Sequence, residues 1–241
     1  MTLKSRTYST ARPLFNHFFP ANVLTWVTGR DMDFMLNSAQ DPFTQKQKMW
    51  LEELVEITPG DIANVKQVHG NKIIRADGPC SGVVEADGLI TDRTNLPLVV
   101  RTADCLPVFL FDMKTPAAGI VHAGWRGTKD TITLAAVNAM IKEFNSRPEN
   151  IKVAFGPCIR PRQYEVGPEF CQHFPQEVVR ENQKYYFDLA LANKNQLIGR
   201  GVLEENIYDC QICTFADQNY HSYRRDGQAA GRILSMIMMR G

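Results

Sequence analysis

Two apolar runs separated by a short turn constrain the fold of this chain more than any other feature. Leu106 to Phe111 and Ala117 to Val121 are rich in branched and aromatic residues, and only DMKTP stands between them. Short apolar runs bounded by turn residues predict buried β-strands. The ends of such strands feed loops, where a rigid sheet usually presents reactive side chains. The remaining elements are therefore expected to form a scaffold around this pair of strands.

The rest of the sequence predicts a mixture of strands and helices. Further strands are expected over residues 23–28, 64–69, 96–103 and 151–155. A capping box at Thr44 and Gln47 predicts a helix with Trp50, Leu51 and Val55 on its apolar face. Four more helices are expected: one capped by Thr128 with its apolar stripe over residues 132–144, and others over residues 167–174, 187–198 and 229–238. No repeat or linker interrupts the 241 residues, so a single domain over 1–241 is expected.

Composition excludes some classes of partner. Lys plus Arg number 27 and Asp plus Glu number 26, which gives no electrostatic argument for binding nucleic acid or an anionic membrane. The first twenty residues lack the apolar core of a signal peptide, and no run approaches the ~18 apolar residues of a spanning helix. A soluble cytoplasmic protein is expected, with its six cysteines as free thiols or metal ligands. The sequence leaves the oligomeric state open and is compatible with a monomer.

Three side chains stand where strands meet loops. Cys105 and His122 border the two central runs, and His69 ends the strand-like segment VKQVHG. One thiolate and two imidazoles make a three-ligand metal site with an open fourth position, as in catalytic zinc sites. The alternative is a buried thiol and two hydrogen-bonded histidines, since cysteine is among the most buried residue types. Spacing alone leaves both interpretations open.

The segment HAGWRGT offers an anion site. Gly124 and Gly127 allow close backbone approach before a predicted helix, whose free amide groups favour an anion. Arg126 between them could add a bidentate contact to phosphate or carboxylate. A tight strand-to-helix turn with a solvated arginine is the alternative.

Two other clusters carry less specific signals. SYRRD at 222–226 could supply substrate contacts through its arginines, or Asp226 could pair with an arginine and cap the last helix. Cys210 and Cys213 form a CxxC that lacks a second pair or a thioredoxin-like context, which favours free thiols. His17, His173 and His221 have no evident partners.

Taken together, six motifs resemble one family. VKQVHG, ADGLITD, TADCLPV, HAGWRGT, GPCIRPRQYEV and SYRRD, in this order, are similar to those of the YfiH-like proteins, also called laccase-domain proteins or multicopper polyphenol oxidases. The resemblance runs from about residue 20 to the C-terminus. By motif, the family's zinc ligands fall on His69, Cys105 and His122.

The resemblance implies an α+β fold, a single domain of mixed β-sheets covered by helices. It also implies a zinc enzyme that phosphorolyses purine nucleosides, with adenosine deaminase and methylthioadenosine phosphorylase activities at the same site. Gln67, Asp87, Arg126 and Arg225 are the expected substrate contacts. Asp87 or Asp104 would shuttle protons, and strand alternation favours Asp87.

Two rival functions follow from the same family. One is a copper-dependent phenol oxidase, although five histidines cannot supply four coppers. The other is an editing hydrolase for peptidoglycan precursors, with Cys105 as nucleophile beside a histidine. The chain also departs from the family, because Gln47 and Lys48 stand where an Asn-Arg pair is common.

Overall fold

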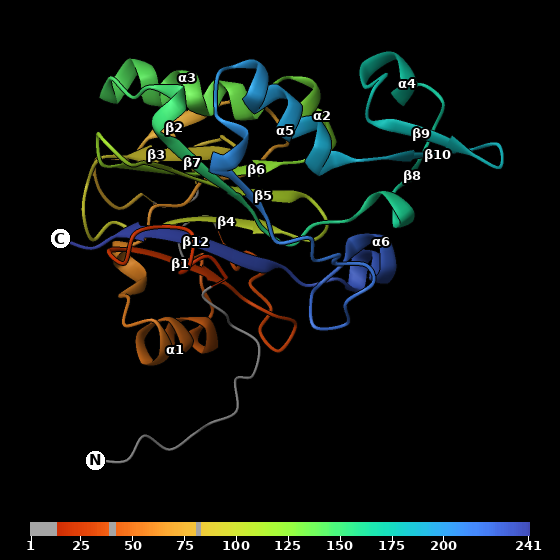
Figure 1. The fold of residues 1–241 in the computed structure, drawn as a ribbon. Helices are drawn as coiled ribbons and strands as arrows, with labels where there is room; N and C mark the ends of the chain where they lie inside the picture. Colours follow the sequence, from red (N-terminus) through yellow and green to blue (C-terminus); the bar gives the residue numbers. More distant parts are fainter. Residues whose placement is uncertain (1–13, 39–41, 81–82) are drawn as a thin grey trace.

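Two sheets stack face to face and enclose much of the apolar core between them (Figure 1). The computed structural model describes residues 14–38, 42–80 and 83–241. The larger sheet has six strands in the order β11-β7-β5-β6-β3-β2, and the smaller has the order β1-β12-β4. Phe109 and Ile120 of the larger sheet share one core with Leu98 and Ile237 of the smaller. With helices outside both sheets, the domain is α+β, as predicted.

The two central runs form the middle of the larger sheet. β5 (Leu106–Asp112) and β6 (Ala117–Ala123) pair antiparallel, and every residue of both strands is buried. Strands covered on both faces are apolar throughout rather than alternating, which explains their composition. The outer strands of this sheet are β2 (Ile73–Arg75), β3 (Gly88–Thr91), β7 (Ile151–Phe155) and β11 (Ile207–Asp209).

Helices cover the outer face of each sheet. α2 (Trp125–Lys129), α3 (Ile132–Phe144) and α5 (Leu189–Gly199) lie over the six-stranded sheet (Figure 1). α1 (Gln45–Leu54) lies over the smaller sheet and begins at the predicted capping box. Its buried Trp50 and Leu51 pack into one cluster with strand residues of that sheet.

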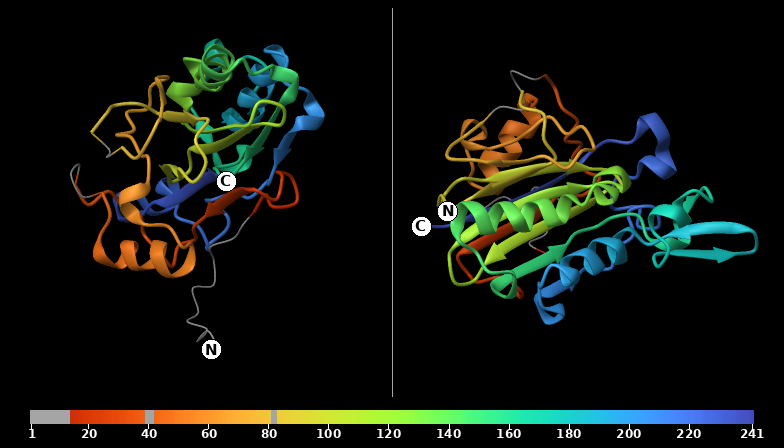
Figure 2. Two further views of the ribbon diagram at one scale, coloured as in Figure 1. Left: turned by 90° about the vertical axis from the view of Figure 1, so that its left-hand side faces the viewer. Right: turned by 90° about the horizontal axis from the view of Figure 1, so that it is seen from above.

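The third sheet projects from one end of the molecule (Figure 2). It contains β8 (Glu165–Val166), β9 (Val178–Glu181) and β10 (Lys184–Phe187), with α4 (Phe170–His173) between its first two strands. The predicted helix over 167–174 is therefore reduced to four residues. α6 (Tyr223–Asp226) lies near the same end, and no helix in the described part of the chain is long and apolar enough to cross a membrane.

The helix predicted over residues 229–238 is wrong. This segment contains β12 (Ile233–Met239), which runs between β1 (Val23–Val27) and β4 (Leu98–Thr102). All seven residues of β12 are buried, so no alternation marked it as a strand. Asp226 therefore caps no long helix. It precedes the short 3-10 helix Gly227–Ala229, but its side chain makes no capping bond there and pairs instead with Arg225 at 2.9 Å and with Arg30 at 3.3 Å.

Two smaller predictions also fail for local reasons. Residues 64–69 make only an isolated bridge at Lys66, and the extended run ends at His69, whose φ of 62° lies in the left-handed region. Thr128 does not cap the long helix but lies inside α2, where its hydroxyl accepts a hydrogen bond from Asn193. The long helix follows Thr131 instead.

Candidate functional site

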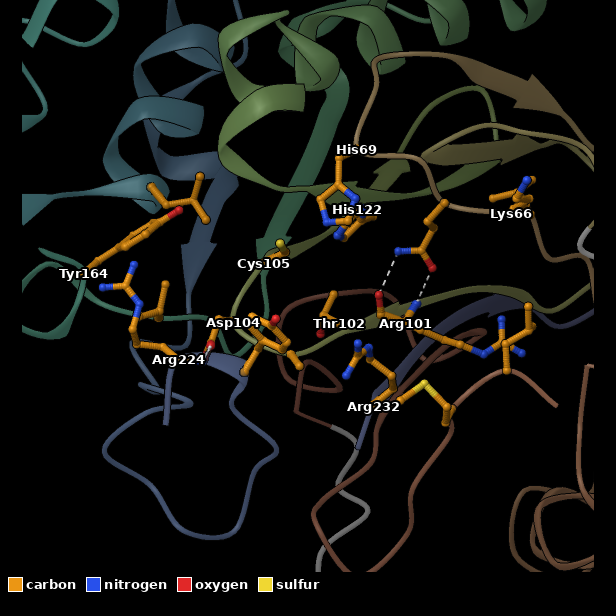
Figure 3. Close-up of a pocket in the computed structure, with 18 residues that line it drawn as sticks. Lys66, His69, Arg101, Thr102, Asp104, Cys105, His122, Tyr164, Arg224 and Arg232 are labelled. Carbon is orange, nitrogen blue, oxygen red and sulfur yellow. Dashed lines mark hydrogen bonds between the residues drawn. The ribbon is translucent and has the colours of Figure 1, made fainter. Parts of the chain in front are cut away.

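Three segments bring His69, Cys105 and His122 together (Figure 3). His69 precedes β2, Cys105 directly precedes β5, and His122 lies near the end of β6. Because Pro107 of β5 pairs with His122 of β6, the thiol and that imidazole meet at one end of the strand pair. The three ligand atoms all lie within 4.8 Å of one another. Within the described residues, this is the only group of three or more His, Cys, Asp or Glu side chains placed to hold a metal ion.

The backbone beside the cluster leaves no room for another side chain. A Cβ at Gly124 would lie 3.1 Å from the Sγ of Cys105 and 3.2 Å from a ring carbon of His69. Gly127 is equally confined, since a Cβ there would lie 2.7 Å from the carbonyl oxygen of Gly70. The glycines of HAGWRGT therefore serve close packing around the three predicted ligands.

Asp87 holds both histidines in place. Its carboxylate is fully buried and accepts hydrogen bonds from the backbone amides of Val68, His69 and Gly70 and from Nδ1 of His122 at 2.8 Å. The bond to Nδ1 leaves the Nε2 of His122 for the cluster. A carboxylate behind a ligating imidazole is the usual way to fix its orientation. Asp87, which was predicted to contact substrate, does not line the cavity. Its hydrogen bonds orient the His69 segment and the His122 ring instead.

Asp104 holds the backbone next to Cys105 in place. Its carboxylate accepts from the hydroxyl of Thr214 and from the backbone amide of Arg224, both at 2.6 Å. Its own carbonyl oxygen accepts from the amide of Ile159. A φ of 89° removes Asp104 from the strand alternation assumed from the sequence, and its side chain reaches the cavity. Three separate segments are thereby bonded to the residue that precedes Cys105.

The electrostatics of the cluster favour a thiolate. Burial raises the pKa of the Cys105 thiol, but His122 and His69 beside it outweigh burial and lower that pKa overall. Burial lowers the pKa of His122, but the Cys105 thiolate and Asp87 raise it by more, so the pKa of His122 is raised overall. A thiolate and two imidazoles suit zinc, and this donor set also accepts copper.

A cavity of about 480 Å³ opens over the three residues, which is enough for a small molecule. Figure 3 shows Tyr164 and Arg224 on one side of the cluster, Lys66 and Arg101 on the other, and Arg232 below it. Among the lining residues that the structure describes, Asp104 is the only carboxylate. The lining also includes apolar side chains: Met35, Leu36, Val65, Ala103, Ile159 and Leu189.

Gln67 lines this cavity but is bound to the backbone of the next strand. Its amide nitrogen donates to the carbonyl oxygen of Arg101 at 2.7 Å, and its amide oxygen accepts from the Arg101 amide at 2.8 Å (Figure 3). Both ends of the side chain are therefore used within the protein. Gln67 attaches the His69 segment to β4.

The two arginines predicted to contact substrate lie outside the cavity lining. The guanidinium of Arg126 lies 4.4 Å from the ring centre of Trp125, and Arg126 is exposed. Arg225 donates to the carbonyl oxygens of Thr214, Phe215 and Tyr220 and pairs with Asp226. It stabilises the loop before α6, in which Ser222 is the N-cap.

Sequence reasoning missed Arg101, Arg232 and Tyr164. Arg101 is the single charged residue of β4, LVVRT, and a cation within an apolar strand was the available signal. Arg232 and Tyr164 offered no such signal in the sequence. Arg232 precedes β12, which was mistaken for a helix, and Tyr164 lies in a loop. Cys210 and Cys213 do not line the cavity, and all six cysteines are free.

Comparison with known proteins identifies the family. The family model described as "Multi-copper polyphenol oxidoreductase laccase" matches residues 33–240. A purine nucleoside phosphorylase of Clostridium acetobutylicum is 35% identical over 182 residues, which are 74% of this chain and 77% of the relative. The purine nucleoside phosphorylase YfiH of Shigella flexneri is 31% identical over 183 residues, 73% of this chain and 72% of the relative.

Two solved structures share the fold over a longer part of the chain. YlmD from Geobacillus stearothermophilus superimposes with a TM-score of 0.84 at 25% identity, covering 100% of this chain and 98% of that one. YfiH from Bacillus licheniformis gives a TM-score of 0.83, covering 91% and 94% of the two chains, and at 23% identity supports the fold alone. The chain belongs to the YfiH-like, laccase-domain family.

Proposed function

We propose that this protein is a zinc-dependent purine nucleoside phosphorylase that also deaminates adenosine and cleaves methylthioadenosine at the same site. The observation that carries the proposal is the convergence of His69, Cys105 and His122 at a cavity sized for a nucleoside. Relatives that bear the name purine nucleoside phosphorylase, at 31–35% identity, support the substrate class.

The donor set fits zinc. A thiolate and two imidazoles leave a fourth position open to the cavity, and Asp87 orients the His122 ring that would coordinate it. Zinc held there would supply Lewis acidity and lower the pKa of a water ligand to about 7. Four coppers would need many more histidines than the five in this chain.

The protein's own side chains divide the remaining tasks. The half-buried Tyr164 ring, with Ile159 and Leu189, offers an apolar wall for a purine, and Arg224 lies 5.2 Å from that ring's centre. In phosphorolysis, an oxygen of phosphate forms a bond to C1′ of the ribose as the bond from C1′ to the purine nitrogen breaks. The purine leaves with the electron pair and takes up a proton. Asp104 is the carboxylate at the cavity that could exchange this proton.

Two other activities compete for the same residues. The description of the matching family favours oxidation of phenols, which would need copper because zinc has no redox chemistry. The thiolate beside His122 favours covalent hydrolysis through Cys105. Each of the three reactions depends on a different reagent: phosphate, oxygen with copper, or a free thiol.

Metal analysis combined with turnover in the absence of air tests the proposal. The purified protein should contain one zinc per chain, release ribose 1-phosphate from inosine only with phosphate present, and deaminate adenosine without it. Phenols should remain unchanged. Oxidation of phenols in air after copper loading, with no turnover of nucleosides, would assign the oxidase function instead. Loss of activity on thiol alkylation in fully metal-free protein would assign the hydrolase.

A further inference from the structure

Arg101 carries a buried charge that no carboxylate of the described residues neutralises. The side chain is 8% exposed, and its Nε donates to the carbonyl oxygen of Phe34 at 3.0 Å. Its guanidinium lies 5.1 Å from the ring centre of Phe43, and its Nη2 has no hydrogen-bond partner in the described part of the chain. Among the described residues, no carboxylate lies within ion-pair distance of it. Burial lowers the pKa of Arg101 only to about 10, so it stays charged at neutral pH.

Arg232 brings a second cation to the same part of the cavity. Leu234 of β12 pairs with Arg101 of β4, so Arg232 is the diagonal neighbour on the same face of the sheet. Its Nη1 donates to the carbonyl oxygens of Ala230 and Gly231. Its backbone amide donates to the carboxylate of Asp33 at 2.7 Å, but within the described ranges its guanidinium forms no ion pair. Both arginines line the cavity (Figure 3).

Three other basic residues near the cavity either form ion pairs or are exposed. Lys66 forms a 2.7 Å ion pair with Glu85, and Arg225 pairs with Asp226. Arg224 is exposed, donates to the carbonyl oxygen of Glu165 and lies against Tyr164. Among the described lining residues, Arg101 and Arg232 are thus the two arginines that are buried or half-buried and whose guanidinium groups form no ion pair.

Arg101 is also held rigidly. Gln67 binds both backbone groups of Arg101, and Phe34 lies in a segment fixed by α1. The side-chain amide of Gln47 donates to the carbonyl oxygens of Asp33 and Met35 on either side of Phe34. A charge removed from water without a partner is unfavourable, whereas one fixed in advance binds an anion without further ordering.

We propose that Arg101 and Arg232 form an oxyanion subsite that binds inorganic phosphate as the second substrate of the cavity. A guanidinium presents two parallel donors that match two oxygens of phosphate, and two guanidiniums balance its dianionic charge. This inference rests on the proposed phosphorylase function and names the residues that would serve its phosphate. It places phosphate beside Arg101 and Arg232 rather than at Arg126, which lies outside the cavity lining.

Phosphate titration of the zinc-loaded protein tests the subsite without any turnover. Arg101→Met keeps the unbranched apolar stem and removes the charge, and Arg232→Met does the same at the second position. Each variant should weaken phosphate binding at least about tenfold, as loss of charge-assisted hydrogen bonds predicts. Arg101→Lys should fall between Arg101→Met and the wild type. The exposed Arg93 is a matched control, and Arg93→Met should bind phosphate as the wild type does.

Thermal unfolding with and without phosphate gives a second readout. Phosphate should raise the Tm of the wild type and of Arg93→Met but not that of Arg101→Met. Without phosphate, Arg101→Met should unfold at the same temperature as the wild type or higher, because it removes an unpaired buried charge. If Arg101→Met does not fold, Arg232→Met and Arg101→Lys still decide the question. Phosphate affinity within about twofold of wild type in Arg232→Met and in the folded Arg101 variants would overturn the subsite.

Adenosine deamination separates failure of the subsite from failure of the proposed function. It needs no phosphate, so Arg101→Met should lower the kcat/KM of phosphorolysis at least about tenfold more than that of deamination, each relative to Arg93→Met. A protein that binds phosphate through Arg101 but turns over no nucleoside would support the subsite and refute the phosphorylase. Adenosine 5′-monophosphate that binds far more tightly than adenosine, in an Arg101-dependent way, would show that the subsite takes a nucleotide and would overturn free phosphate as its ligand.

Discussion

The buried polar groups at the two ends of the cavity differ in how completely they are hydrogen-bonded. The metal end comprises His69, Cys105 and His122, and the cationic end comprises Arg101 and Arg232. At the metal end, the Asp87 carboxylate is saturated by four hydrogen bonds from the segments that carry His69 and His122. Asp104, next to Cys105, accepts one hydrogen bond on each carboxylate oxygen, from Thr214 and from Arg224. At the cationic end, the almost fully buried Arg101 has an Nη2 with no hydrogen-bond partner among residues 14–38, 42–80 and 83–241. Saturated groups hold the framework, whereas an unsatisfied buried group marks the place where a ligand completes the structure.

The largest expected effect is at the metal end itself. Cys105→Ala removes the thiolate from a three-ligand site, so zinc content should fall from one per chain to below about a tenth. The fold should survive because the core does not depend on the metal, and circular dichroism would check this. Cys171→Ala, in α4 outside the cavity lining, is the matched control and should keep its zinc. Full zinc occupancy in Cys105→Ala would remove Cys105 from the ligand set.

Asp87→Asn tests whether saturation at the metal end matters. Asparagine keeps the shape but loses the charge and part of the acceptor capacity for three amides and His122. Zinc affinity, measured by competition with a chelator, should fall about 10- to 100-fold. The free energy of unfolding should fall by about 1–3 kcal/mol. Unchanged zinc affinity would mean that the histidines are oriented without Asp87, and the contrast between the two ends would lose its basis.

Gln67 connects the two ends, and its loss should act on stability. Gln67→Ala leaves the amide and carbonyl groups of Arg101 without partners, which should cost about 1–3 kcal/mol in urea unfolding. The KM for adenosine should stay within about threefold, since both ends of Gln67 are occupied by backbone. A rise in that KM with unchanged stability would restore Gln67 as a substrate contact.

The smallest effect is expected at Arg126. Sequence reasoning assigned it to phosphate, whereas the structure leaves it exposed beside Trp125 and outside the cavity lining. Arg126→Lys should therefore change the apparent phosphate affinity by less than about twofold, measured from the phosphate dependence of inosine cleavage. A loss of tenfold or more would move the phosphate site to HAGWRGT and make the charges of Arg101 and Arg232 structural.

The sequence predicted the metal end better than the cationic end for a physical reason. Cys105 and His122 flank apolar runs whose strand character is evident locally, and His69 is identified by its motif. Arg101 and Arg232 meet only because β12 pairs with β4, and β12 was mistaken for a helix. Burial on both faces removed the alternation that distinguishes a strand from a helix. The hydrogen bonds of Asp87 and Asp104 also depend on unusual backbone angles at His69 and Asp104, which side-chain patterns do not encode.

The position of β12 in the smaller sheet has a consequence for biosynthesis. β12 separates β1 from β4, and its pairs with β1 join residues more than 200 positions apart. On the ribosome, His69, Cys105 and His122 emerge more than a hundred residues before β12, roughly 5–20 seconds earlier at usual elongation rates. During that interval the nascent chain can assemble the metal ligands, while β1 and β4 expose unpaired edges that invite chaperones or aggregation. The cationic end of the cavity, which requires Arg232, is completed last.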